Sequence, residues 1–300
     1  MRAAAILGLG RSVGDLNPFQ DSGSDEWLIG MPSSAADADA ILIFGGDGTI
    51  HRHLGQMVNL GLPVLVVPAG SGNDLARSLG LRCVRDSLAA WRKFRRGDHN
   101  VRAIDAGMIA PLDPGETHEP ALGVAQRSPR YFCCVAGVGL DSEVARHANQ
   151  LPRWLRANGG YVLSLLPKIF TFAPFPLRIR VSGNANESWT MRSDRPTLLA
   201  AFANTPLYGG GMKIAPRAKM DDGALDVCVV GGVDPFKLFC MFPTVYAGKH
   251  LAMREVEYFH APRLRVETEQ PLDVYADGEY VCRTPVQVEI AGRAWRVVVP

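Results

Sequence analysis

The chain has 300 residues, of which 47% are apolar and 21% are charged, and its formal net charge is +2. This composition is typical of a soluble protein with a substantial core, and the small net charge gives no reason to expect a nucleic-acid partner. No uncharged apolar stretch reaches the ~18 residues that a membrane span requires. Six cysteines without a CxxC pair, mostly inside apolar runs, favour buried free thiols in a reducing cytoplasm.

Short aliphatic runs alternate with helical patterns over the first hundred residues. The runs are AAAILGL (3–9), AILIF (40–44) and PVLVVP (63–68). Each is bounded by turn residues, as buried parallel strands are, and apolar residues recur at helical spacing between them. The alternation predicts a Rossmann-like parallel α/β domain over residues 1–103, with its site at the carboxyl ends of the strands.

Two glycine-rich turns follow two of these strands. GGDGT (45–49) precedes a helical pattern, so its glycines allow a ligand to approach and the helix start offers free N–H groups to an anion. Alone, the same turn fits a tight connection in which Asp47 caps the helix. PAGSGND (68–74) repeats the arrangement, and Ser71 and Asn73 can donate to phosphate oxygens. Together the turns could clasp one nucleotide.

Period-two alternation dominates from residue 104 onwards. It is clear in LRIRV (177–181), ALDVCVV (224–230) and VQVEI (286–290), which Gly, Pro and Asp clusters separate. This pattern predicts an antiparallel β-sandwich domain over residues 104–290, and the residues after 290 could rejoin the first domain. The cleft between the two domains is the expected active site.

Residues 151–177 form the most apolar part of the second half. Arg153, Arg156 and Lys168 stand at the edges of this stretch. It could line a lipid slot and rest on an anionic membrane, or form a core helix that leads into a strand.

The ordered motifs resemble a known family. They are FGGDGTIHRHL (44–54), VPAGSGNDLARSLG (67–80), AIDAGMI (103–109), YFCCVAGVGLDSEV (131–144), YGGGMKIAPRAKMDDGALDV (208–227) and VYADGEYV (274–281). Together they resemble the catalytic domain of the diacylglycerol kinase and sphingosine kinase superfamily, most closely its soluble bacterial lipid kinases. GGDGT alone would also suit NAD kinases and phosphofructokinases, so the order of the set carries the resemblance.

The resemblance implies a lipid kinase that uses ATP and Mg²⁺ to phosphorylate a hydroxyl of a lipid such as diacylglycerol. Glu279 matches the general base of the family, Asp277 lies on the same face of an extended strand, and Asp47 is expected to face Mg²⁺ or the attacking hydroxyl. The residues implied for nucleotide binding are Gly45, Gly46, Asp47, Gly48, Thr49, Ile50, His51, Arg52, Gly70, Ser71, Gly72 and Asn73.

The same resemblance implies a structural Mg²⁺ site in the loop KMDDGA. Asp222 would supply its side chain, and Lys219 and Ala224 their main-chain carbonyls, an oxygen-only set that suits magnesium. Asp74, Asp105 and Asp141 match supporting carboxylates of a network around the site. His51 and His53, at i and i+2 of a helix, point apart and are not expected to share a metal ion.

Two alternatives stay open at the level of sequence. The first is a kinase for a soluble acceptor, as in NAD kinases. The second is a homologue that binds nucleotide or lipid with weakened catalysis, because only 44 residues precede Gly45 and the Asn17-Pro18 pair lacks the following glycine of the family's nucleotide loop. The expected partners are ATP, a lipid alcohol and a membrane surface, and a homodimer is possible in principle.

Overall fold

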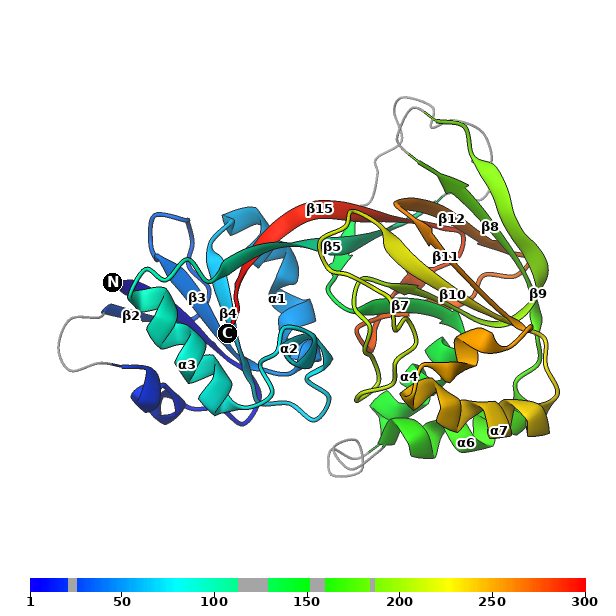
Figure 1. Ribbon diagram of the computed structural model, residues 1–300, viewed down its shortest axis with the longest axis horizontal. Helices are drawn as coiled ribbons and strands as arrows, with labels where there is room; N and C mark the ends of the chain where they lie inside the picture. The colour runs from blue at the N-terminus through cyan, green and yellow to red at the C-terminus, as the bar shows by residue number, and fades with distance from the viewer. Residues whose placement is uncertain (21–25, 113–128, 152–159, 184–186) are drawn as a thin grey trace.

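A computed structural model describes residues 1–20, 26–112, 129–151, 160–183 and 187–300, arranged as two halves (Figure 1). The first half has a parallel sheet in the order β4-β3-β1-β2. Its strands are β1 (Arg2–Leu7), β2 (Glu26–Ile29), β3 (Ala40–Gly45) and β4 (Pro63–Pro68). Its helices are the 3₁₀ helix η1 (Val13–Phe19), α1 (Asp47–Leu60), α2 (Asp74–Ser78) and α3 (Val84–Arg95). The predicted parallel α/β domain is confirmed.

The two central strands of this sheet are buried along their whole length. Every residue of β3 and of β4 is buried, because helices or neighbouring segments cover both faces of the sheet. This explains their continuous aliphatic sequences, since a strand buried on one face only would alternate with polar residues. In the described part of the connection from β1 to β2, the chain forms the 3₁₀ helix η1, which contains Asn17 and Pro18.

The second half is an antiparallel β system flanked by helices. Its strands are β6 (Arg130–Phe132), β7 (Val135–Gly139), β8 (Phe175–Ser182), β9 (Thr190–Ala203), β10 (Leu225–Gly231), β11 (Val256–Ala261), β12 (Arg263–Thr268), β13 (Asp273–Ala276) and β14 (Glu279–Arg283). Its helices are α4 (Leu140–Gln150), α6 (Gly160–Thr171), α7 (Pro235–Tyr246) and the 3₁₀ helix η2 (Lys249–Ala252). The expected antiparallel architecture is confirmed, and α4, α6 and α7 lie together below the sheet in Figure 1.

Two long strands connect the halves. β5 (Val101–Pro111) and β15 (Val286–Val298) pair antiparallel and run side by side from one half to the other (Figure 1). The end of β15 joins the first sheet, where Arg296 and Val297 pair parallel with Pro63 and Val64 of β4. Residues 103 and 290, which limit the domains by sequence, lie inside these strands, and we propose that the two domains share the β5–β15 pair.

The structure also bears on the cysteines and on membrane-spanning helices. All six cysteines are free, although Cys83 and Cys240 are exposed rather than buried. Among the described residues, no helix is long and apolar enough to cross a membrane.

The carboxyl ends of β3 and β4 meet through two glycines. A Cβ atom on Gly70 would lie 2.5 Å from the Cα of Gly46, and one on Gly46 would lie 2.9 Å from the Cα of Gly70. Real Cβ atoms do not approach backbone this closely, so both positions require glycine. The two glycine turns predicted from the sequence are therefore in direct backbone contact.

We expect Gly70→Ala to lower the free energy of unfolding by about 1–3 kcal/mol, because the methyl group would push the two turns apart. Gly55→Ala, within α1, is the matched control. A Cβ there would lie 3.7 Å from Tyr131, an ordinary contact, and alanine favours a helix interior by about 0.5–1 kcal/mol over glycine. Urea unfolding of both variants measures the effects, and a Gly70→Ala protein as stable as the native one would contradict the close packing.

Candidate active site

Asp47 joins the two glycine turns. It is the first residue of α1, and its carboxylate oxygens accept the backbone N–H groups of Asp74 (3.0 Å) and Leu75 (3.1 Å) at the start of α2. Burial raises the pKa of Asp47, the two amide bonds oppose this, and the charge of Asp277 adds to it. The sequence predicted a metal- or hydroxyl-facing carboxylate. The contacts with α2 are an additional role that it did not indicate, and the metal-facing role stays a prediction.

The predicted nucleotide residues differ in what they can offer a ligand. Asn73 adopts a left-handed conformation (φ 55°), and its amide accepts from Gly70 N (2.8 Å) and donates to Gly70 O (2.7 Å), so it closes its own turn. Ile50 is a core residue and presents only backbone to the site. Ser71 and Arg52 are exposed. Ser71 therefore remains the side-chain donor available in the second turn.

Thr49 packs beneath the first turn. A Cβ on Gly45 would lie 2.6 Å from the Cβ of Thr49, and one on Gly8 would lie 2.9 Å from its Oγ1. The side chain thus fills the space between the ends of β1 and β3, which requires glycine at both positions. Gly48 stands on the other side of the turn, where its missing side chain leaves room for Glu279.

Asp74 is a buried carboxylate with an unsatisfied oxygen. Its Oδ2 accepts the N–H of Gly210 (2.8 Å), whereas its buried Oδ1 has no hydrogen-bond partner among the described residues. Burial and the neighbouring charge of Asp47 raise the pKa of Asp74 to about 6. Two adjacent buried carboxylates, one with a free oxygen, form an environment that a divalent cation would stabilise.

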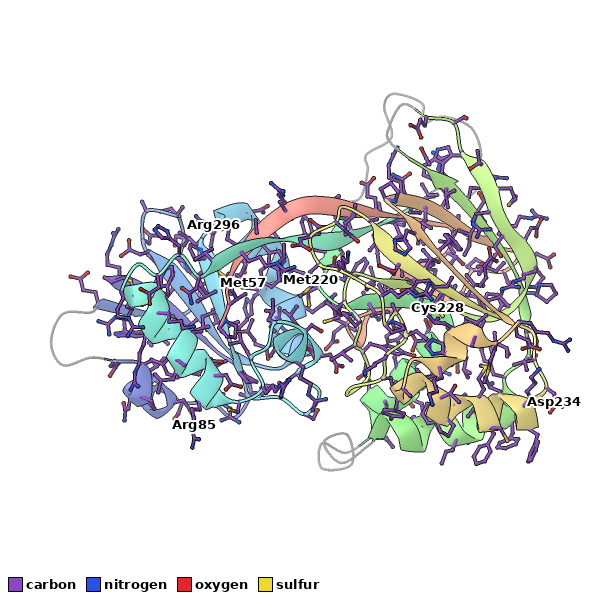
Figure 2. The ribbon with its side chains drawn as sticks, viewed as in Figure 1. Met57, Arg85, Met220, Cys228, Asp234 and Arg296 are labelled. Atoms are coloured by element: carbon purple, nitrogen blue, oxygen red, sulfur yellow. The ribbon has the colours of Figure 1, made fainter. Side chains whose placement is uncertain are left out.

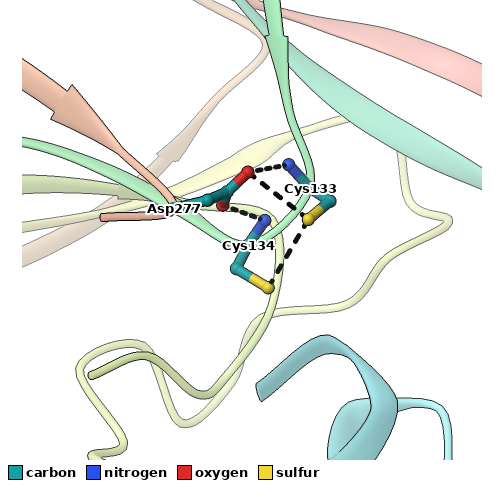
Figure 3. Close-up of side chains that lie close together, drawn as sticks. All are labelled: Cys133, Cys134 and Asp277. Atoms are coloured by element: carbon teal, nitrogen blue, oxygen red, sulfur yellow. Dashed lines mark hydrogen bonds between the residues drawn. The ribbon is translucent and has the colours of Figure 1, made fainter. Parts of the chain in front are cut away.

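Asp277 holds three segments of the chain together. Its carboxylate accepts the backbone N–H groups of Cys133 (2.9 Å) and Cys134 (2.8 Å), as Figure 3 shows. It also accepts the N–H of Val135 (3.3 Å) and lies 3.0 Å from Nδ1 of His51. Burial alone would raise the pKa of Asp277. The contacts with His51 and the backbone amides outweigh this effect, so the pKa lies below its ordinary value.

Glu279 lies beside the first glycine turn. Asp277 and Gly278 form the tip of the β13–β14 hairpin, both with positive φ (51° and 84°), and Glu279 begins β14. Its Oε1 lies 3.1 Å from where a Cβ of Gly48 would stand. The side chain is exposed, in contrast to the fully buried carboxylate of Asp277. The structure thus brings Glu279, Asp277 and the start of α1 together. The expectation that Asp277 and Glu279 share one face of an extended strand is wrong, because Asp277 stands in the hairpin turn with a buried side chain, whereas the side chain of Glu279 is exposed.

Asp105 supports the predicted metal loop instead of facing the glycine turns. It lies on β5, and its two oxygens accept the N–H groups of Gly223 (2.8 Å) and Arg293 (2.6 Å). Its own N–H donates to the carbonyl of Met220, which lies between the two halves in Figure 2. These bonds fix the loop over residues 219–224, where Lys219 and Asp222 are exposed.

The loop meets two residues that the sequence did not indicate. Side-chain ligand atoms of Asp222, Asp226 and His260 all lie within 4.8 Å of one another. Asp226 accepts the hydroxyl hydrogen of Tyr258 (2.6 Å) and lies 3.1 Å from Nε2 of His260, while its buried Oδ2 has no partner among the described residues. His260 is distant in sequence from Asp222 and Asp226. It lies beside them because β10 pairs with β11, so sequence spacing alone could not reveal it.

An apolar cavity lies behind α4, α6 and α7. The helices line it with Leu140 and Asp141, Leu165 and Ile169, and Leu238 and Met241, and parts of β9, β10 and residues 208–214 complete the wall. Asp141 brings a carboxylate to this wall. Lys168, at the predicted edge of the apolar stretch, bonds Glu143 (3.0 Å), whereas Arg153 and Arg156 lie outside the described residues.

Family models match both halves of the chain. Residues 27–109 match the diacylglycerol kinase catalytic domain, and residues 134–299 match the YegS C-terminal NAD kinase beta sandwich-like domain. A diacylglycerol kinase of Mycobacterium tuberculosis is 31% identical over 266 residues, which cover 89% of this chain and 78% of that protein. The chain belongs to the bacterial diacylglycerol kinase family. It is a lipid kinase of diacylglycerol kinase type, as its ordered motifs indicated.

Solved structures share the fold of this lipid kinase. A diacylglycerol kinase from Bacillus anthracis superimposes with a TM-score of 0.65 and 18% identity, covering 100% of this chain and 97% of that chain. An NAD kinase from Archaeoglobus fulgidus, solved in complex with ATP, gives a TM-score of 0.51 and 13% identity over 99% and 93% of the two chains. At these identities the likeness concerns the fold alone.

The raised pKa of Asp74 makes its cost to stability depend on pH. Between its ordinary value of 3.8 and about 6, the folded protein keeps a proton that the unfolded chain releases, so this carboxylate lowers stability as pH rises through that window. In EDTA we expect Asp74→Asn to raise the free energy of unfolding at pH 8 by up to about 3 kcal/mol, and by less at pH 5.

Urea unfolding at the two pH values measures this difference. Asp194→Asn, an exposed substitution of the same kind on β9, controls for the loss of one negative charge. A gain from Asp74→Asn that is equal at both pH values would contradict the raised pKa that burial and the charge of Asp47 give Asp74.

Proposed function

We propose that this kinase transfers the γ-phosphoryl group of ATP, with Mg²⁺, to a hydroxyl of a diacylglycerol-type lipid. The observation that carries the proposal is the position of Glu279 against the start of α1, where two nucleotide-type glycine turns meet. A cytoplasmic location, where ATP is present, suits this reaction. We assign nucleotide binding, proton transfer, Mg²⁺ binding and acceptor binding to particular residues below.

The first part is nucleotide binding by the two turns. Gly46, Gly48 and the free N–H groups at the start of α1 suit the β- and γ-phosphates, because a helix start attracts anions and glycine allows close approach. Ser71, exposed in the second turn, would donate its hydroxyl to the same phosphates. Asp47 keeps the turns in register by its two bonds to the α2 amides.

The second part is proton transfer from the acceptor hydroxyl. Asp277 is ill suited to take a proton, because its carboxylate is fully buried, already accepts backbone and imidazole contacts, and has a lowered pKa. Glu279 is exposed beside the glycine turn and is the better general base. We assign Asp277 to positioning the hairpin that carries Glu279.

The donor chemistry of the site fits Mg²⁺. Asp74 has a buried oxygen without a partner among the described residues, next to the charge of Asp47, and the loop over residues 219–224 offers the exposed carboxylate of Asp222 and main-chain oxygens of Lys219 and Ala224. Oxygen-only sets are those that Mg²⁺ prefers. An ion bound at Asp74 would neutralise phosphate charge, whereas an ion in the loop over residues 219–224 would be structural. The family network implies Asp74, Asp105 and Asp141 as supporting residues.

The apolar cavity favours a lipid over a soluble acceptor. Leu140, Leu165, Ile169, Leu238 and Met241 offer hydrocarbon to a ligand. A polar acceptor such as NAD would gain nothing from such a wall, whereas an acyl chain would be removed from water by it. A bilayer is the source of such a lipid, which makes contact with a membrane surface part of the proposal.

We expect Glu279→Gln to lower phosphoryl transfer to a diacylglycerol panel by about 10²–10⁴-fold, with little change in stability, because the amide cannot take the hydroxyl proton. The assay follows label from [γ-³²P]ATP into the lipid, with Mg²⁺ present. Glu269→Gln, an exposed substitution of the same kind, is the control and should retain activity. Unchanged turnover in Glu279→Gln would overturn the base assignment, and transfer to NAD but to no lipid would overturn the acceptor.

A further inference from the structure

Helix α7 is apolar on its solvent-facing side as well as on its buried side. Leu238, Met241 and Val245 are buried, as expected for a helix that packs on a core. The opposite side, at helical spacing, carries Phe236 (70% exposed), Phe239 (43%), Cys240, Pro243 and Tyr246 (41%). A surface helix of a globular protein normally has charged or polar residues on that side.

The neighbouring helix α6 extends this surface. Leu165 and Ile169 face the cavity, while Leu166 (37%) and Phe170 (56%) are exposed. The ring centroids of Phe170 on α6 and Phe239 on α7 lie 6.0 Å apart, and the two helices lie side by side in Figure 1. Leu166, Phe170, Phe236, Phe239 and Tyr246 thus form one surface, called here the aromatic face. A contiguous exposed apolar patch of this kind marks an interaction site.

The charged side chains of α6 and α7 are already paired. Neither α6 nor α7 contains an aspartate or glutamate. The charged side chains within the two helices are Lys168, which bonds Glu143 of α4, and Lys237, which bonds Glu255 (2.6 Å). Asp234, labelled at the right-hand end of α7 in Figure 2, accepts the N–H groups of Phe236 and Lys237 as the helix cap. The face itself presents no net charge.

We propose that the aromatic face docks the protein on the surface of a lipid bilayer, with its rings in the interfacial layer. Phenylalanine and tyrosine on an uncharged helical surface suit that layer, and carboxylates, which a bilayer would repel, are absent from both helices. The helices that carry the face also line the apolar cavity, so the surface that meets lipid and the wall proposed to receive lipid are two sides of one layer. The inference rests on the proposed lipid acceptor. Because both lysines are paired, the docking depends on apolar burial, with little dependence on salt or on anionic lipid.

Vesicle binding tests the docking surface. Sedimentation with phosphatidylcholine vesicles, with and without an equal part of phosphatidylglycerol, should give binding that changes little with lipid charge or salt. We expect Phe236→Ser/Phe239→Ser to weaken it at least about tenfold, because two exposed aromatic side chains no longer enter the interface. Ile29→Ser/Met191→Ser changes two similarly exposed apolar residues elsewhere and should bind as the native protein does. Equal binding by both double variants would overturn the proposal.

The two exposed cysteines report which face meets the lipid. Cys240 lies within the exposed side of α7, and Cys83 lies in the first half, just before α3. A polarity-sensitive dye on Cys240, in a Cys83→Ser protein, should shift to the blue when vesicles are added. The same dye on Cys83, in a Cys240→Ser protein, should not shift. A shift at Cys83 alone would place the contact on another surface and overturn the proposal.

Two further measurements separate this inference from its alternatives. Transfer to a short-chain diacylglycerol dissolved as monomers should be equal in the native protein and in Phe236→Ser/Phe239→Ser, because no bilayer is involved. If the native protein binds vesicles through this face but phosphorylates no lipid, the proposed function fails while the docking surface stands. If the native protein is a dimer without lipid and the double variant a monomer, the face joins two copies and the membrane proposal is overturned.

Discussion

The carboxylate of Asp277 is the constraint on which the site depends. Burying an ionised carboxylate is costly unless it is fully hydrogen-bonded, and Asp277 meets that condition with backbone N–H groups of residues 133–135 and with His51. The amides and His51 come from two distant parts of the chain, so this one group fixes the hairpin tip, the start of β7 and helix α1 relative to one another. The place of Glu279, two residues further on, follows from that.

The other buried carboxylates divide into supports and reactive groups by the same reasoning. Both oxygens of Asp105 accept backbone N–H groups, and so do both oxygens of Asp47. These two carboxylates therefore hold separate segments of the chain together. Asp74 differs, because it keeps a buried oxygen without a partner among the described residues and has a raised pKa. A cation would relieve the repulsion between Asp74 and Asp47 and contribute binding energy to the same turns that suit phosphate. Acidic residues beside a phosphate site are therefore physically consistent once a metal ion is included.

The sequence predicted the parts of this site better than their connections. The turns at residues 45–49 and 68–74 were recognisable because glycine has a specific conformational use after a buried strand. The contact between Gly46 and Gly70, and the bond between His51 and Asp277 across 226 positions, depend on how β3, β4 and the distant hairpin pack, which no local pattern encodes. The same holds for His260 beside Asp222. The sequence allowed the residues after 290 to rejoin the first domain, but the pairing of β15 with β4 is likewise a long-range contact.

Helices α6 and α7 show a limit of a different kind. Their apolar sequences are equally compatible with burial on all sides, and only the packing shows that one side of each faces the cavity and the other faces solvent. Polar or charged substitutions are therefore unfavourable on both sides of this helical layer. A polar residue on the inner side would leave an unsatisfied group against hydrocarbon, and a charge on the outer side would oppose contact with lipid. Under the proposed docking, the cavity and the aromatic face are one constraint on the sequence, and the exposed phenylalanines of α6 and α7 follow from it.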